Sequence, residues 1–193
     1  MATGKYRQNT YLRGDEVFVL SFDRPDRNYF TMNNSHVVLT GSITTVLTKI
    51  AYGYYLLTGR ELEVTSGLRT ADEQAREMRK KAQYGEVRFL GLYIRHNLAE
   101  KIWEAYDKAH KAGAGEDGEV EAITAVIREQ VNKGEDVSKH LSGSAFDVRN
   151  RTMNSCERDS FEAVVKEVLG SADSSHLLKN EPGEPHFHVQ FDR

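Results

Sequence analysis

The pattern of hydrophobic and polar positions along the chain predicts both strands and helices. Short apolar runs that favour strands lie at residues 16–22, 37–39, 62–66, 144–148, 175–178 and 187–191. Apolar residues at helical spacing lie at residues 41–57, 71–82, 94–112, 120–131 and 160–169. Strands and helices mixed in this order predict an α+β fold, with a small, mostly antiparallel sheet and flanking helices.

Local signals refine these boundaries. Thr70 followed by Glu73 is a capping-box pattern and predicts the start of the helix at 71–82. Gly59 is expected to end the preceding helix. The polar residues 1–15 are expected to form a loose lead-in. Turns are predicted at residues 23–28, 113–118 and 179–185.

Length and composition limit the classes of protein to consider. The 193 residues predict a single domain, residues 1–193, with a helical insert at about 84–136. With 39% hydrophobic and 28% charged residues, the composition is that of a soluble globular protein. The net charge of −3 offers no basic surface, so nucleic acid is not an expected partner. The single Cys156 excludes an internal disulfide framework.

Neither a membrane span nor a secretory signal is predicted. The longest apolar run, residues 50–57, is too short to cross a bilayer. The first eight residues have no apolar core behind their charges. The expectation is a protein made in the cytoplasm and not inserted into a membrane.

Two segments bring together residue types that bind metal ions. On a strand, His186 and His188 project to the same side, so both imidazoles reach one point. His140 precedes Asp147 by seven residues, and a sharp turn at Gly143 can fold it back beside the carboxylate. Two imidazoles and a carboxylate hold a catalytic zinc and leave its fourth position to water. The set has one histidine more than such a site needs, and the surplus imidazole can accept a proton from the water.

Each segment taken alone has a simpler interpretation. A His-x-His pair on a terminal strand is often surface histidine, and an Asp in a Ser/Gly-rich loop is often a turn or cap residue. The two segments together favour the metal site, because independent parts of the chain supply complementary ligands.

These residues resemble a known family. The pattern Ser138-x-His140-x-x-Gly143-x-Ala145-x-Asp147, followed by His186-x-His188, resembles the signature of the zinc D-alanyl-D-alanine metallopeptidases, which share a zinc fold with lysostaphin-type enzymes and the hedgehog signalling domain. Upstream, Ser66-Gly67-Leu68-Arg69-Thr70-x-x-x-Gln74 is similar to the family's Ser-Gly-Tyr-Arg-Ser-x-x-x-Gln segment, with departures at Leu68 and Thr70. The motifs run in the family order over residues 66–191. Residues 1–60 and 84–136 carry no such resemblance.

The resemblance implies a role for each matching residue. His140, Asp147 and His188 would be the zinc ligands, and His186 would assist the water or stabilise the transition state. Arg69 would stabilise the oxyanion at the scissile carbonyl or hold a substrate carboxylate.

Four further residues are candidates with open alternatives. One branch of the family has a Glu three residues before the last ligand, where this chain has Pro185. Glu184 is therefore either a catalytic partner of His186 or a solvated turn residue. Ser138, Ser144 and Gln74 are candidates for substrate binding. Loop capping by the serines and support of Arg69 by Gln74 are the alternatives.

The resemblance implies zinc-dependent hydrolysis of peptidoglycan stem-peptide bonds near D-alanine, by a D,D-carboxypeptidase or D,D-endopeptidase. Without an export signal, the enzyme would be a phage lysin or an injected effector that relies on a delivery or release system. A cytoplasmic D-Ala-D-Ala dipeptidase and a non-catalytic zinc-stabilised binding domain are the alternatives.

Overall fold

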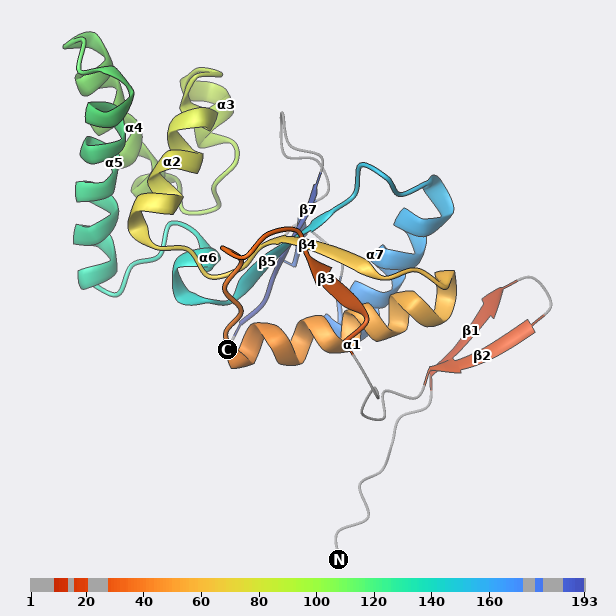
Figure 1. Ribbon diagram of the computed structural model, residues 1–193. Coiled ribbons are helices and arrows are strands. Elements are labelled where there is room, and N and C mark those ends of the chain that lie inside the picture. The colour runs from red at the N-terminus through yellow and green to blue at the C-terminus, as the bar shows by residue number, and fades with distance from the viewer. Residues whose placement is uncertain (1–8, 14–15, 21–27, 172–175, 179–185, 193) are drawn as a thin grey trace, which may run out of the picture.

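The computed structural model describes residues 9–13, 16–20, 28–171, 176–178 and 186–192 (Figure 1). The strands are β1 (Asn9–Arg13), β2 (Glu16–Leu20), β3 (Phe30–Met32), β4 (Leu62–Ser66), β5 (Ala145–Arg149), β6 (Leu177–Leu178) and β7 (His186–Gln190). The helices are α1 (Gly41–Thr58), α2 (Ala71–Ala82), α3 (Glu86–Leu90), α4 (His96–Lys111), α5 (Gly115–Asn132), α6 (Lys139–Ser142) and α7 (Ser155–Leu169). Residues 23–27 of the predicted turn at 23–28, and the whole predicted turn at 179–185, lie outside the described residues.

Five strands form the main sheet, in the order β3-β4-β5-β7-β6. The β3–β4 pair is parallel, and the other three pairs are antiparallel. This confirms the predicted α+β fold with a small, mostly antiparallel sheet. Strands β1 and β2 pair with each other in a separate two-stranded sheet.

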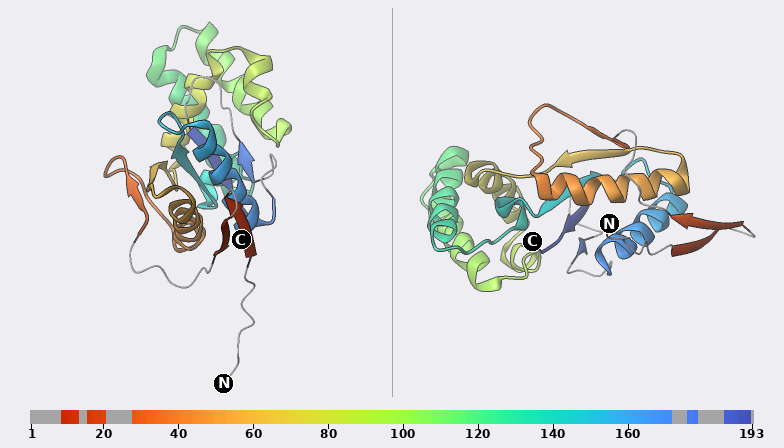
Figure 2. Two further views of the ribbon diagram at one scale, coloured as in Figure 1. Left: turned by 90° about the vertical axis from the view of Figure 1, so that its right-hand side faces the viewer. Right: turned by 90° about the horizontal axis from the view of Figure 1, so that it is seen from below.

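One face of the sheet is apolar and packs on two helices. Helices α1 and α7 lie side by side against it, as the views in Figures 1 and 2 show. Phe161 of α7 stacks on Phe187 of β7, with ring centroids 4.9 Å apart. The residues that β4, β5 and β7 contribute to this core are Leu62, Val64, Phe146, Val148, Phe187 and Val189.

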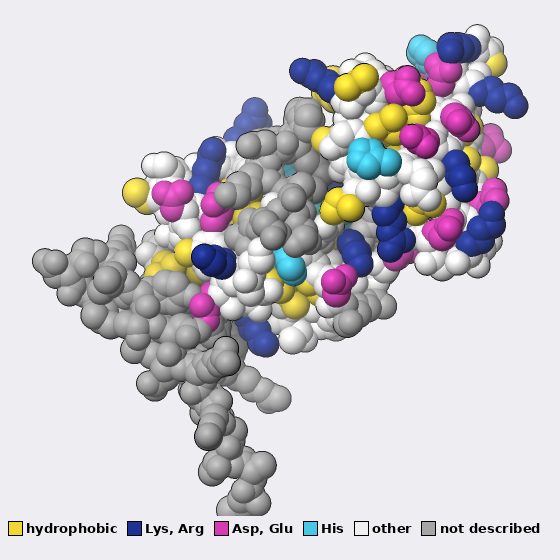
Figure 3. Space-filling model, turned by 180° about the vertical axis from the view of Figure 1, so that it is seen from behind, with side chains coloured by type: hydrophobic (Ala, Val, Ile, Leu, Met, Phe, Trp, Pro, Cys, Tyr) yellow, Lys and Arg dark blue, Asp and Glu magenta, His cyan; other side chains and the backbone are white. Residues whose placement is uncertain are grey.

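The helices α2 to α5 form a second hydrophobic cluster, at one end of the sheet (Figure 1). Helices α2 and α4 both pack on α5 through buried residues such as Met78, Ile102 and Ile123. Val137 and Leu141 pack against the same cluster and connect it to α6. Acidic and basic side chains are interspersed over these helices on the face in Figure 3. Helices α3, α4 and α5 occupy the region predicted to be a helical insert.

Capping side chains account for several helix boundaries. The predicted capping box at α2 is present, with Thr70 accepting from the Glu73 amide and Glu73 from the Thr70 amide. Gly59 ends α1 in the left-handed conformation, as predicted. Helix α7 begins five residues before the predicted start, at a second capping box formed by Asn154 and Glu157.

Three further local predictions were wrong, and one strand was not predicted. Residues 9–13 are a strand and not part of a loose lead-in, since they pair with β2. Residues 37–39 form no strand but one isolated bridge, between Val38 and Leu68. Helix α5 begins at Gly115, inside the predicted turn at 113–118. Strand β3 was not predicted, because its three residues carry too short a pattern and its pairing with β4 is non-local.

None of the helices in the described part of the chain combines the length and the apolar character that a membrane span requires.

Replacing Phe161 by Ala should lower the free energy of unfolding by about 3–5 kcal/mol, because Phe161 is fully buried and its removal leaves a cavity beside Phe187. Urea denaturation measures the change. Val87→Ala is the control, since Val87 is 87% exposed and should change stability by less than about 0.5 kcal/mol. Equal effects of the two substitutions would contradict this description of the core.

Candidate metal centre

Three side chains with metal-binding atoms converge on the face of the sheet opposite α1 and α7. Asp147 of β5 and His188 of β7 are directly opposite each other in the antiparallel register, so their side chains project to the same face. His140 comes from the one-turn helix α6, which precedes β5. All three are buried, with exposed fractions of 2% for His140, 1% for Asp147 and 6% for His188.

The turn at Gly143 brings His140 back over the sheet, as the sequence predicted. Gly143 ends α6 in the left-handed conformation at φ 67°, which glycine adopts without steric cost. Its carbonyl accepts a hydrogen bond from the Thr40 hydroxyl at 3.0 Å, which attaches the turn to the start of α1. Residues 139–142 form a helical turn that Ser138 caps.

The three candidate ligand atoms lie close together. Oδ1 of Asp147 is 2.9 Å from Nδ1 of His188 and 3.2 Å from Nε2 of His140. The two imidazole nitrogens are 3.1 Å apart. A tetrahedral ion with bonds of about 2.0–2.1 Å holds its ligand atoms about 3.3 Å apart, so a small shift of the side chains fits them to such an ion. These residues can therefore hold a metal ion.

The protonation states of His140 and Asp147 suit metal binding. Burial lowers the pKa of His140 to about 4, so its imidazole is neutral at pH 7. Burial also acts to raise the pKa of Asp147, but its interactions with His140 and His188 and the charge of Arg69 outweigh it. The pKa of Asp147 therefore lies well below its ordinary value, and the carboxylate is ionised. Neutral imidazole and ionised carboxylate are the ligand forms that bind metals.

Partners outside the triad direct lone pairs toward its centre. Nδ1 of His140 lies 2.6 Å from the Gly67 carbonyl oxygen, which can only accept. Nδ1 therefore carries the proton, and Nε2 of neutral His140 presents a lone pair. When the proton of His188 is on Nδ1, this N–H donates to Asp147. When the proton is on Nε2, that N–H donates to Oε1 of Gln190 at 3.4 Å. In that second tautomer three lone pairs converge, which a cation stabilises.

Arg69 binds the other oxygen of the Asp147 carboxylate. Nη2 of Arg69 donates to Oδ2 of Asp147 at 2.6 Å, while Oδ1 faces the histidines. Nε of Arg69 donates to the Ser66 hydroxyl at 2.8 Å, and Nη1 donates to Oε1 of Gln74 at 3.4 Å. These three acceptors fix the guanidinium. Arg69 in turn orients the carboxylate, so that one oxygen faces the ligand triad.

A β-bulge places Ser66 on the metal-binding face. Val64 pairs with Val148 on the core face, whereas Ser66 pairs with Asp147, one residue out of the regular register. Without the extra residue, Ser66 would be opposite Phe146 and would face the core. The bulge thus turns the Ser66 hydroxyl toward Arg69.

The absence of a side chain at Gly67 permits a close approach of two segments. A Cβ atom at this position would lie 2.2 Å from the Val38 carbonyl oxygen. That oxygen accepts a hydrogen bond from the Leu68 amide at 2.8 Å. The contact holds the segment that carries Arg69 and the Gly67 carbonyl beside His140.

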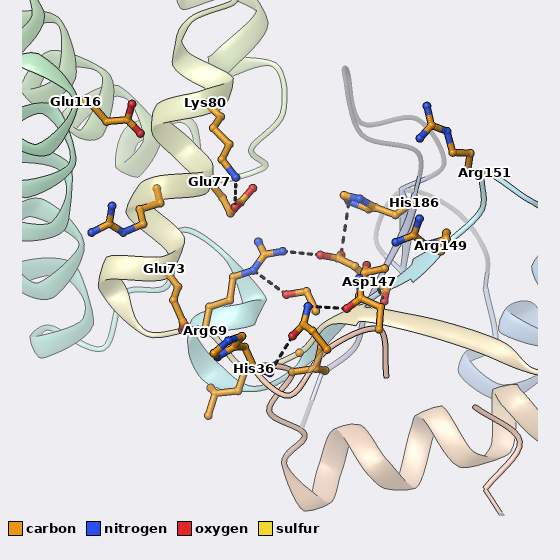
Figure 4. Close-up of a pocket in the computed structure, with 18 residues that line it drawn as sticks. His36, Arg69, Glu73, Glu77, Lys80, Glu116, Asp147, Arg149, Arg151 and His186 are labelled. Carbon is orange, nitrogen blue, oxygen red and sulfur yellow. Dashed lines mark hydrogen bonds and ion pairs between the residues drawn. The ribbon is translucent and has the colours of Figure 1, made fainter. Parts of the chain in front are cut away.

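His186 lies next to the triad but is not its closest member. Its Nε2 is 3.8 Å from Oδ1 of Asp147, and the residue is 7% exposed. Figure 4 shows His186 pointing toward Asp147 from above, while Arg69 approaches this carboxylate from the left. It therefore lies beside the candidate ligands, and its role in proton transfer stays a prediction.

Two cavities meet at these residues. The larger has a volume of about 610 Å³, and its lining includes His186, Arg149, Arg151 and residues of α2 (Figure 4). The smaller has a volume of about 130 Å³, and its lining includes His140 and His188. Arg69 and Asp147 line both.

The remaining candidates have different surroundings. Gln74 is buried and accepts from Arg69, which fits the supporting role. Ser138 caps α6 through the His140 amide at 3.4 Å and also lines the smaller cavity. Ser144 is buried and lines neither of the two cavities, so substrate contact gains no support from its position. Glu184 lies outside the described residues, and its role stays a prediction.

Sequence reasoning missed several contributors to the site. Gln190 lies two residues after His188 on the same face of β7, and the alternation of the strand was a signal that could have found it. No local pattern identifies the Gly67 carbonyl as the partner of His140, because the two are 73 positions apart.

Comparisons of the chain with protein-family models, with curated proteins and with solved structures found no match.

The purified protein should bind about one equivalent of zinc. His140→Ala, Asp147→Asn and His188→Ala should each weaken binding by more than about 100-fold, because the two alanine substitutions each remove a ligand nitrogen and Asn replaces the ionised carboxylate by a neutral amide. Competition with a chromogenic chelator measures the affinity. His96→Ala is the matched control, since His96 is exposed at the start of α4 and should bind zinc as the wild type does.

The metal-free protein should lose stability as the pH falls from about 6.5 to about 4. Unfolded chains take up the His140 proton near pH 6.5, whereas in the folded state the pKa of His140 is lowered to about 4. His140 should therefore contribute a loss of up to roughly 3 kcal/mol over this interval and none above it. Urea unfolding in the presence of a chelator, at pH 7.5, 5.5 and 4.5, measures the slope. His140→Gln should flatten the slope, and an unchanged slope would refute the assignment.

Proposed function

We propose that this protein is a zinc-dependent peptidase that hydrolyses peptidoglycan stem-peptide bonds near D-alanine. The observation that carries the proposal is the convergence of His140, Asp147 and His188 at one point, with a fourth ionisable side chain, His186, beside them and a cavity of about 610 Å³ in front. The ligand set alone supports a metal-dependent hydrolase. The substrate class comes from the resemblance of the three motifs.

Zinc is the metal that fits this donor set best. Two imidazole nitrogens and one carboxylate oxygen are a ligand set of catalytic zinc sites. Gly67, Arg69 and Gln190 supply the outer hydrogen bonds that such ligands need. A bound zinc supplies Lewis acidity and lowers the pKa of a water toward neutrality.

His186 is the proposed proton acceptor. Its Nε2 lies near the ligand triad, and its side chain lines the larger cavity, so it can contact a substrate bound there. A neutral imidazole accepts a proton from the attacking water and returns it to the leaving amine. Glu184 remains a proposed partner in this step.

Arg69 has two proposed tasks. Its hydrogen bonds to Asp147, Ser66 and Gln74 make it a positioning residue for the ligand carboxylate. Arg69 also lines both cavities, which supports a contact between its guanidinium and the scissile carbonyl oxygen.

The larger cavity suits a charged peptide. Its lining includes the cations Arg149 and Arg151 at the end of β5, and the acids Glu73 and Glu77 on α2 (Figure 4). Stem peptides carry several carboxylates and often an amine. A volume of about 610 Å³ lies in the range of pockets that bind ligands larger than a single residue. Delivery to the cell wall by release or injection remains part of the proposal.

Mass spectrometry of purified peptidoglycan fragments tests the function. After incubation with zinc-loaded protein, loss of one D-alanine from pentapeptides would identify a carboxypeptidase, and conversion of crosslinked dimers to monomers an endopeptidase. His188→Ala, which lacks one ligand, should be inactive on both. Activity on free D-Ala-D-Ala alone would favour the dipeptidase, and zinc binding without any hydrolysis would favour a non-catalytic zinc-stabilised domain.

His186→Gln should separate metal binding from catalysis. Gln keeps a polar side chain but cannot accept a proton, so the variant should bind zinc within about 3-fold of the wild type. Its kcat on the cleaved fragment should fall by about 100-fold or more. The zinc affinity and the rate of product formation are measured on the same preparation. Normal turnover would show that another group accepts the proton.

A further inference from the structure

The two cavities that meet at the ligand triad differ greatly in size. His186 lines the cavity of about 610 Å³, whereas His140, His188 and Gln190 line the cavity of about 130 Å³. A peptide whose scissile bond lies at the triad must extend into both. The smaller volume is well below the range of about 300–1,000 Å³ that holds drug-sized ligands, so it suits one small residue.

The outer wall of the smaller cavity comes from the helical region that has no resemblance to the peptidase family. The loop between α3 and α4 contributes Leu92, Tyr93, Ile94 and Arg95. Val137, just before α6, adds a further apolar side chain. These side chains line the smaller cavity on the side of the helical region, and they limit its volume to about 130 Å³.

Arg95 is the cation of this cavity that is available to a ligand. Arg95 is exposed. It occupies the N-cap position of α4, but its side chain makes no capping hydrogen bond. Within the described part of the chain, no acidic side chain lies at ion-pair distance from it. The positive end of the helix dipole of α4 adds to the attraction for an anion at this point.

The other positively charged side chains that line the cavity already have partners, and its acidic side chains are fewer than its basic ones. Arg69 is bound to Asp147, and Lys139 is bound to Asp192 at 3.0 Å. Lys81 is buried and makes contacts of its own. Asp136 contributes one negative charge. The cavity thus combines a small apolar volume with an excess of positive charge, the properties that bind a small residue with a free carboxylate.

We infer that the smaller cavity binds the C-terminal residue of the substrate and that Arg95 holds its carboxylate. As far as it concerns cleavage, the inference rests on the proposed function. Hydrolysis breaks the C–N bond before this residue, adds the water oxygen to the shortened peptide as a carboxylate, and leaves both water protons on the released amine, which becomes an ammonium. The helical region thereby makes the protein a carboxypeptidase for small terminal residues rather than an endopeptidase.

Binding to the metal-free protein tests the pocket without any turnover. The ligands are N-acetyl-D-Ala-D-Ala and its C-terminal amide, which differ in the charge that Arg95 would meet. Isothermal titration calorimetry should show the acid binding about 10-fold more tightly than the amide, as for a charge-assisted hydrogen bond. Arg95→Gln should bind the two equally. Arg88→Gln, an exposed arginine of the same region that lines neither cavity, should keep the preference.

The outcomes separate the pocket from the catalytic proposal. Equal binding of acid and amide by the wild type, or a preference that survives in Arg95→Gln, would overturn the inference whatever the enzyme cleaves. A preference that depends on Arg95, together with removal of terminal D-alanine by the zinc-loaded protein, supports both proposals. The same preference without hydrolysis supports the pocket and refutes the peptidase. Faster cleavage of crosslinked dimers than of pentapeptides would refute the exopeptidase assignment alone.

Discussion

The carboxylate of Asp147 connects the parts of this structure on which the candidate site depends. It is almost fully buried, and an ionised group in that position needs compensation from every side. Arg69 binds Oδ2, while His140 and His188 approach Oδ1. Oδ2 is therefore bound by Arg69, which positions the carboxylate, and Oδ1 faces the two histidines and can bind a metal ion. Removing any of these partners changes both the charge balance of the interior and the geometry of the ligands.

The sheet makes this arrangement possible by separating two environments across one strand. On β5, Phe146 and Val148 pack into the core with α1 and α7, while Asp147 between them faces the site. The bulge in β4 moves Ser66 to the same face as Asp147. Core packing on one face therefore fixes the strand that holds the charged residues on the other, so the rigidity of the apolar layer is transmitted to the ligands.

The helices α2 to α5 give the site its asymmetry. They have a hydrophobic core of their own, and they meet the sheet where the segments carrying Arg69 and His140 run between the two parts. Helix α2 borders the larger cavity, and the loop between α3 and α4 borders the smaller one. The candidate metal centre thus lies between two spaces of unequal size and different charge.

By itself the sequence determined the elements whose signals are local. Helical spacing located α1, α2 and α4, the capping pair Thr70 and Glu73 marked where α2 begins, and alternation located β4, β5 and β7. The spacing of His186, His188, His140 and Asp147 was enough to predict a ligand set, because strand geometry and a glycine turn are short-range properties. Only the tertiary structure decided that Arg69 binds Asp147, that the Gly67 carbonyl orients His140, that β3 pairs with β4, and that the α3–α4 loop lines one cavity. These contacts join residues that lie far apart along the chain, and their geometry follows from how the sheet and the helices pack rather than from any pattern that neighbouring residues carry.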